Sequence, residues 1–356
     1  MKSLSNISRT QLSNEKLIKL LDTYEEKGKE YYYDMLFEKD FDVIFRQTKE
    51  EDNFYIGKFF KFAFTDHKLR QLSRRDLKPQ NQDEYQYRNY KRVISRIHQS
   101  NKKFDLFHSD VIDLSKMISK DVSKVQINYI DNPVKDLLNP NQKIQMTIEL
   151  EKLINLFKSE VARKEHEVIA LIINFYIDFV NMEVFNQYNE QIGLFLMFAL
   201  IQKYFNVFKY VSFFKYLYKK QNVFNQGILE ANYNWHEGYS SYERLYTLFI
   251  DILQDSYDEL KKEAHRYEFI KDLAKGDNVE ASILKIKTSD IFSKQDVRDL
   301  NPLVSDSTIE RTLKKMRDEG TIRPLGTGRS AKWQLIRKQD EFQTMQLSLF
   351  SEADFE

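Results

Sequence analysis

Hydrophobic residues recur at helical spacing along most of the chain. Within residues 150–161 the apolar side chains are three or four positions apart, and the same spacing returns in residues 169–180 and 245–253. Such a one-sided stripe predicts an amphipathic helix that buries one face. Residues 193–205 are apolar nearly all round, which is expected of a helix at the centre of a bundle.

Few helix-breaking residues interrupt this pattern. The chain has 356 residues but only nine glycines and five prolines, so long helices are expected. Weak breaks fall at residues 70–90 and 120–145, and residues 1–275 are otherwise predicted to be almost wholly helical. No glycine lies between Gly57 and Gly193. A glycine-rich phosphate loop is therefore excluded from that stretch, because its backbone must approach the anion closely.

The pattern changes after Gly276. A short polar-apolar helix is predicted at residues 289–300, and a second helix follows, with Ser307 and Glu310 as a capping box and Gly320 as its left-handed C-terminal residue. Two short strands at residues 321–325 and 332–336 then flank a glycine-containing turn. Helix, helix, strand, turn and strand is the order of a winged helix.

The predicted fold is therefore mainly α, a helical bundle followed by a small α/β winged-helix domain. The expected divisions are an N-terminal helical region (1–79), a helical core (80–275), a winged-helix domain (276–338) and an acidic, disordered tail (339–356).

Charge and composition narrow the possible functions. Lys and Arg total 55 and Asp and Glu total 54, yet residues 281–338 carry a net charge of +6 and residues 339–356 a net charge of −5. The absence of cysteine excludes disulfides, thiolate zinc sites and a cysteine nucleophile. The longest apolar run, residues 194–201, is far too short to span a bilayer, and no apolar signal core begins the chain. A soluble, cytoplasmic protein without a membrane partner is expected.

The basic winged helix predicts binding to duplex DNA, because the second helix of such a pair enters the major groove. The alternative is a winged helix used only for packing or dimerisation. One module makes few phosphate contacts, so a homodimer is expected. The candidate DNA-binding residues are Ser305 and Ser307 at the helix start, Thr308, Arg311, Thr312 and Lys315 on its outward face, and Arg329 and Lys332 on the wing.

The acidic tail contains a second candidate binding site. Gln346, Leu347, Leu349 and Phe350 lie in a pentapeptide, Gln-Leu-Ser-Leu-Phe, which resembles the peptide by which bacterial replication proteins bind the sliding clamp. The leucine and phenylalanine would enter an apolar pocket and the glutamine amide would set the register. Alternatively, the tail is amphipathic and folds back on its own domain.

Residues 179–194 read Phe-Val-Asn-Met-Glu-Val-Phe-Asn-Gln-Tyr-Asn-Glu-Gln-Ile-Gly-Leu. This stretch is similar to a family motif, an apolar residue followed by His-Pro-Phe-x-Asp/Glu-Gly-Asn-Gly-Arg-x-x-Arg, and residues 165–260 around it resemble the core of the Fic (Fido) family of nucleotidyltransferases. Residues 208–213 and 234–239 (Asn-Trp-His-Glu-Gly-Tyr) also look like family landmarks. The resemblance extends over about residues 80–338, and a C-terminal winged helix is common in the family.

The resemblance also assigns roles to the positions of the motif, and most of the residues differ. Glu183 stands where the family has its catalytic histidine, and Gln187 where it has the acidic metal ligand. Only Phe185 and Asn189 match. The other differing positions are Tyr188 and Glu190, in place of two phosphate-cradling glycines, and Gln191 and Leu194, in place of two arginines.

These differences favour a catalytically inactive Fic-like protein that regulates transcription or another DNA process through its winged helix. One alternative is an active or altered Fic-type enzyme that transfers AMP to a protein hydroxyl. Another is a protein scaffold that binds the sliding clamp. No cofactor is expected, and ATP and Mg²⁺ are implied only by the enzyme alternative. The six histidines show no metal-ligand spacing, so no metal site is expected.

Overall fold

The structure is a computed structural model that describes residues 2–9, 13–100, 104–131, 143–270, 275–286, 291–301, 304–326 and 331–336. The chain forms two compact units. The first comprises Met1–Glu38 and Phe45–Lys262, and the second comprises Lys39–Ile44 and Glu263–Glu356. This division falls at residue 262, whereas the sequence placed the end of the helical core at residue 275.

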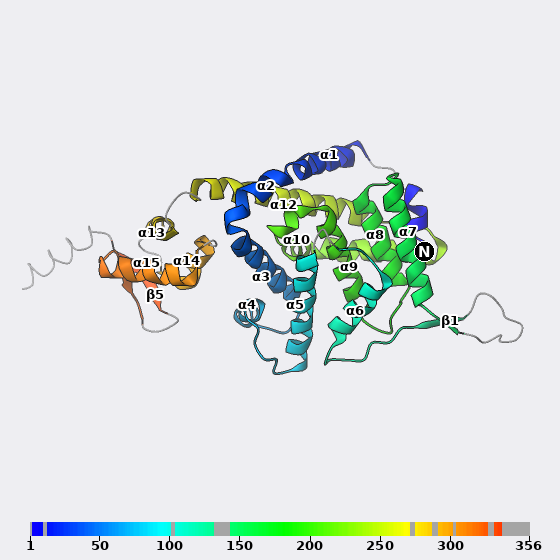
Figure 1. Ribbon diagram of the computed structural model, residues 1–356, viewed down its shortest axis with the longest axis horizontal. Helices are drawn as coiled ribbons and strands as arrows, with labels where there is room; N and C mark the ends of the chain where they lie inside the picture. The colour runs from blue at the N-terminus through cyan, green and yellow to red at the C-terminus, as the bar shows by residue number, and fades with distance from the viewer. Residues whose placement is uncertain are drawn as a thin grey trace, which may run out of the picture. The chain divides into compact units, whose positions relative to one another are not determined.

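Among its described residues, the first unit is built of helices, connecting loops and one hairpin (Figure 1). Its α-helices, of which α3 and α12 continue into the second unit, are α1 (Asn14–Gly28), α2 (Glu30–Phe37), α3 (Phe41–Phe59), α4 (Asp66–Arg74), α5 (Gln82–Ser100), α6 (His108–Ser119), α7 (Thr147–Arg163), α8 (Val168–Asn181), α9 (Asn189–Tyr204), α10 (Phe213–Lys219), α11 (Gln221–Tyr233) and α12 (Glu243–Ile270). Short 3-10 helices occur at Leu4–Arg9, Glu38–Asp40, Asn206–Lys209 and Trp235–Glu237.

Helix α9 lies in the core of this unit, as its apolar sequence predicts. Every residue from Ile192 to Gln202 is buried, and α8 packs beside it (Figure 1). Gly193 permits this close packing, because a Cβ atom there would lie 3.1 Å from side-chain atoms of α8. The predicted stripes of α7, α8 and α12 are likewise confirmed as buried faces.

The interval between α6 and α7 contains a feature that the sequence did not predict. Strands β1 (Tyr129–Asp131) and β2 (Lys143–Gln145) pair antiparallel, with Ile130 opposite Ile144. The hairpin lies within the predicted break at residues 120–145, which is confirmed, but its strands were not predicted. Strands of three residues are too short to show a period of two in the sequence.

A buried polar network joins four helices of the same unit. His98 Nε2 on α5 forms a hydrogen bond of 2.8 Å with Asp52 Oδ2 on α3. His98 Nδ1 forms another of 2.8 Å with Gln202 Nε2 on α9. Asp52 also accepts hydrogen bonds from the Ser212 hydroxyl at 2.7 Å and the Phe214 amide at 3.1 Å. Both Asp52 and His98 are fully enclosed, so the network satisfies polar groups that burial would otherwise penalise.

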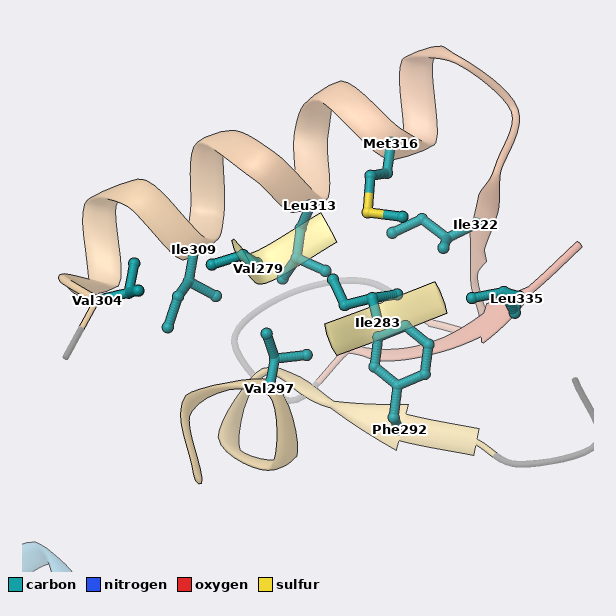
Figure 2. Close-up of a cluster of buried hydrophobic side chains, with 10 residues drawn as sticks. All are labelled: Val279, Ile283, Phe292, Val297, Val304, Ile309, Leu313, Met316, Ile322 and Leu335. Carbon is teal, nitrogen blue, oxygen red and sulfur yellow. The ribbon is translucent and has the colours of Figure 1, made fainter. Parts of the chain in front are cut away.

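The second unit contains a small antiparallel sheet packed on helices. Its elements are α13 (Lys275–Leu284), β3 (Ile291–Ser293), α14 (Lys294–Leu300), α15 (Asp306–Asp318), β4 (Ile322–Pro324) and β5 (Lys332–Leu335). The strand order is β3-β5-β4. Figure 2 shows Ile309, Leu313 and Met316 of α15 pointing toward side chains of α13, α14 and the sheet.

Two local predictions for this unit are wrong, whereas the two predicted strands, β4 and β5, and the left-handed glycine are confirmed. The helix expected at residues 289–300 begins only at Lys294, because Ile291–Ser293 pairs with β5 as a strand. Ser305, not Ser307, caps α15 and accepts the Thr308 amide. Gly320 follows that helix with φ of 71°, the left-handed conformation that glycine adopts without a Cβ clash.

Within the described part of the chain, no helix combines the length and the apolar character needed to cross a bilayer.

Candidate functional site

The positions that resemble the family motif lie in the connection between α8 and α9 and in the first turns of α9. The backbone of the connection is unusual at both ends, since Glu183 has φ of 48° and Tyr188 has φ of 66°. Residues other than glycine rarely adopt this left-handed region, and each instance costs on the order of 1–3 kcal/mol. Tyr188 is the N-cap residue of α9. It thus adopts a conformation that suits glycine, the residue that the family pattern has at this position.

Residues 124–128 run along this loop and hold its backbone. The Asn128 amide donates to the Val184 carbonyl at 2.9 Å, and the Asn186 amide donates to the Gln126 carbonyl at 3.0 Å. These bonds make an antiparallel bridge between Ile127 and Phe185. The Val184 carbonyl and the Asn186 amide of the loop are therefore hydrogen-bonded within the protein.

Side chains of the loop strengthen the same contact. The Asn186 side chain accepts the Gln126 amide at 2.9 Å, and Gln187 Nε2 donates to the Lys124 carbonyl at 3.1 Å. Tyr188 donates its hydroxyl to Gln86 on α5 at 3.1 Å. The amide that stands in place of a metal-binding carboxylate thus forms a hydrogen bond with the backbone.

Asn189, which matches the family motif, shapes the loop from inside. Its Oδ1 accepts the Phe185 amide at 2.9 Å, and its Nδ2 donates to the Phe185 carbonyl at 2.6 Å. Phe185 itself is only 2% exposed, so its ring packs inside the protein. Hydrogen bonds between the two matching residues therefore close the turn.

The remaining motif positions differ from the family pattern in burial and charge. Leu194 is 2% exposed within the core, and Glu190 brings a negative charge to the first turn of α9. Burial raises the pKa of Tyr176, and the nearby Glu190 carboxylate raises that pKa further. A phosphate approaching this helix start would meet the like charge of Glu190, and no glycine would let it approach the backbone closely.

The α15 helix carries the candidate nucleic-acid interface. Ser307, Arg311 and Lys314 are exposed on the face opposite Ile309, Leu313 and Met316. Within the described residues, neither Arg311 nor Lys314 forms an ion pair. Sequence reasoning missed Lys314, although its spacing from the buried stripe could have identified it.

The other predicted residues of this interface occupy varied environments. Thr312 is 5% exposed, so its predicted outward position is wrong. It lies beside the stripe of Ile309, Leu313 and Met316 and faces inward. Ser305 is used as the helix cap, Thr308 is half-buried and Lys332 is exposed. Arg329 and the tail residues Gln346, Leu347, Leu349 and Phe350 lie outside the described residues.

Lys315 is exposed but already has acidic partners. Its Nζ lies 3.0 Å from Glu280 and 3.7 Å from Glu319. The hydrogen bond to Glu280 raises the pKa of Lys315. Lys315 would have to exchange these partners for a phosphate, so its contribution to DNA binding is expected to be smaller than that of Arg311 or Lys314.

A further group of polar side chains lies between α7 and α8. Ligand atoms of Glu160, Glu165 and His166 lie within 4.8 Å of one another. Glu160 already accepts a hydrogen bond from Arg163 at 2.8 Å, which supplies its counter-charge. The group escaped sequence reasoning because it combines the end of one helix with the following turn.

Comparison with known proteins supports the fold. A Fic family protein from Desulfovibrio desulfuricans superimposes with a TM-score of 0.51 at 10% sequence identity, over 92% of this chain and 98% of that chain. A Fic domain containing signaling protein from Bacteroides thetaiotaomicron gives a TM-score of 0.48 at 14% identity, over 69% of this chain and 98% of that chain. No family model and no curated protein matches the sequence. The chain therefore has a Fic fold, as its sequence predicts.

Proposed function

We propose that this Fic-fold protein does not transfer nucleotides and acts as a DNA-binding regulator through its C-terminal unit. The observation that carries the proposal is the exposed Arg311–Lys314 face of α15, which lacks acidic partners among the described residues. The order α13, β3, α14, α15, β4, β5 is that of a winged helix, in which the helix equivalent to α15 enters the major groove.

The geometry of the α8–α9 loop supports loss of nucleotide transfer. Gln187 is bonded to a backbone carbonyl, Leu194 is buried, and Glu190 places a negative charge at the helix start. Phosphoryl transfer depends mainly on positioning and on charge stabilisation by metal ions and cationic side chains. Glu183 can accept a proton, but these neighbours would not hold a triphosphate beside it.

Calorimetric titration of the full chain with ATP and Mg²⁺ tests this part of the proposal. No saturable heat is expected, and incubation with a cell lysate should add no AMP to any protein by mass spectrometry. An AMP adduct that disappears in the Glu183→Ala variant would overturn the claim of inactivity.

Fluorescence anisotropy with labelled duplex DNA tests the second part. A face that neutralises about three phosphates should lose ~40-fold in affinity between about 50 and about 200 mM salt, because bound counterions are released. A homodimer, which we propose as the binding form, would double the number of contacts and steepen this dependence. Light scattering of the complex measures the stoichiometry. Affinity that is independent of salt would contradict binding to the phosphate backbone.

A second candidate function is binding to the bacterial sliding clamp through residues 346–350. The supporting observation is the pentapeptide itself, flanked by acidic residues near the end of the chain. A short peptide that becomes ordered on binding should have an affinity on the order of micromolar, dominated by its aromatic anchor. A labelled 339–356 peptide should therefore bind the clamp, and binding should be lost on joint replacement of Leu349 and Phe350 by alanine.

A further inference from the structure

A hollow lies in the first unit between α5, α6, α9 and residues 104–107. Its volume is about 290 Å³. The hollow is separate from the α8–α9 loop. The α9 side chains that line it, Phe195, Leu196 and Ala199, lie one to three turns beyond the start of that helix. None of the motif positions lines it.

The floor of the hollow is apolar. Each of the three helices contributes to it, and Ala199 is the smallest of these side chains. The floor residues, all buried, are Val93, Ile97, Leu114, Phe195, Leu196 and Ala199. An apolar surface of this kind favours a ligand that replaces water over it.

The charged groups at the mouth already have partners within the chain. Arg96 lies 3.7 Å from Asp110, which also accepts the Phe107 amide at 3.2 Å. Asp105 lies 3.3 Å from the Lys158 ammonium, and that ammonium stands 4.0 Å from the centre of the Phe107 ring. A charged ligand would have to break one of these pairs or bring its own counter-charge.

We propose that this hollow binds a small, uncharged, apolar molecule. Apolar walls favour the body of such a ligand, and the mutually paired charges at the mouth give no net attraction to an anion or a cation. A cavity of about 150 Å³ lined by similar side chains is large enough to bind benzene. A hollow of about 290 Å³ therefore suits a molecule of one or two rings or a short aliphatic chain.

Thermal unfolding of the full chain with indole, octanoate and octylammonium as probes tests the chemical class. Indole should raise the melting temperature in a saturable way, and the two charged probes should bind at least ~10-fold more weakly. Methyl NMR of the unaltered chain should place the indole shifts on Val93, Ile97, Leu114, Leu196 and Ala199. Tighter binding of either charged probe, or indole shifts on other methyl groups, would overturn the proposal.

Two matched substitutions separate binding from general stability. Ala199→Val narrows the hollow and should weaken indole binding at least ~10-fold, whereas Ala170→Val makes the same chemical change on α8, outside the hollow, and should leave the affinity within ~2-fold. If either variant fails to fold, Arg96→Ala provides a test at the mouth, where indole affinity should again stay within ~2-fold. Unchanged binding in a folded Ala199→Val variant, or a large loss in Arg96→Ala, would contradict the proposal.

Discussion

The α8–α9 loop and the exposed face of α15 differ in what their polar side chains contact. In the loop, Gln187 and Asn189 form hydrogen bonds with the protein's own backbone. On α15, Arg311 and Lys314 face solvent without an acidic partner among the described residues. Polar groups that are satisfied within the fold stabilise it, whereas unpaired cations on a convex helix face are available to an external anion. The amide side chains of the loop therefore stabilise the fold, whereas the cations of α15 are the basis of the proposed binding to DNA.

Placing the family's arginine at the buried position of Leu194 should produce the largest effect. Leu194→Arg is expected to lower the free energy of unfolding by ~3–5 kcal/mol, because it places an unpaired charge in the core. Gln191→Arg is the matched control, since Gln191 is half-buried and its side chain can reach water, and it should change stability by less than ~1 kcal/mol. Urea denaturation measures both. Equal stability of the two variants would mean that the core can accommodate the family arginine.

Reversing the charge of the α15 face should abolish most DNA binding. The double variant Arg311→Glu with Lys314→Glu is expected to reduce affinity at least ~100-fold, because two attractive phosphate contacts become repulsive. Arg317→Ala is the control on the same helix, because Arg317 pairs with Asp318 at 2.7 Å, and it should change affinity by less than ~3-fold. Anisotropy titrations compare them. Similar losses in both would move the interface away from the Arg311–Lys314 face.

Removing the hydrogen bonds between Asn189 and Phe185 should lower the stability of the protein without changing its affinity for DNA. Asn189→Ala deletes two hydrogen bonds to the Phe185 backbone and should lower the free energy of unfolding by ~2 kcal/mol. Glu183→Gln changes an exposed side chain and should stay within ~0.5 kcal/mol. Chemical denaturation reports the first effect, and unchanged DNA affinity in both variants separates the loop from the interface. A loss of DNA affinity in a folded Asn189→Ala variant would contradict this separation.

The smallest expected effect distinguishes the two possible faces of α15. Thr312→Val should alter DNA affinity by less than ~2-fold, because Thr312 is 5% exposed and cannot contact a phosphate. Lys315→Ala should reduce affinity only slightly, since Lys315 already pairs with Glu280. The salt dependence of binding provides the readout. A large loss of DNA affinity in either variant would mean that DNA contacts the face predicted from sequence, which included Thr308, Thr312 and Lys315.

The sequence by itself determined the helical body and, in the C-terminal unit, the order α14, α15, β4, β5. Apolar spacing identifies the buried faces of α7, α8, α9 and α12, because the period of a helix is fixed by its own backbone geometry. The left-handed residue after α15 could be predicted for the same reason, since Gly320 suits that conformation locally. The resemblance of residues 179–194 also located the loop that joins α8 to α9.

Only the tertiary structure decided what those side chains contact. The bonds from Gln187 to Lys124 and from His98 to Asp52 join residues that are far apart in sequence, so no local pattern encodes them. The β1–β2 hairpin, the inward turn of Thr312 and the pairing of Lys315 with Glu280 likewise depend on neighbouring elements. Helical periodicity specifies which face of an element is apolar, but the partner of each polar group follows from the packing of distant segments against one another.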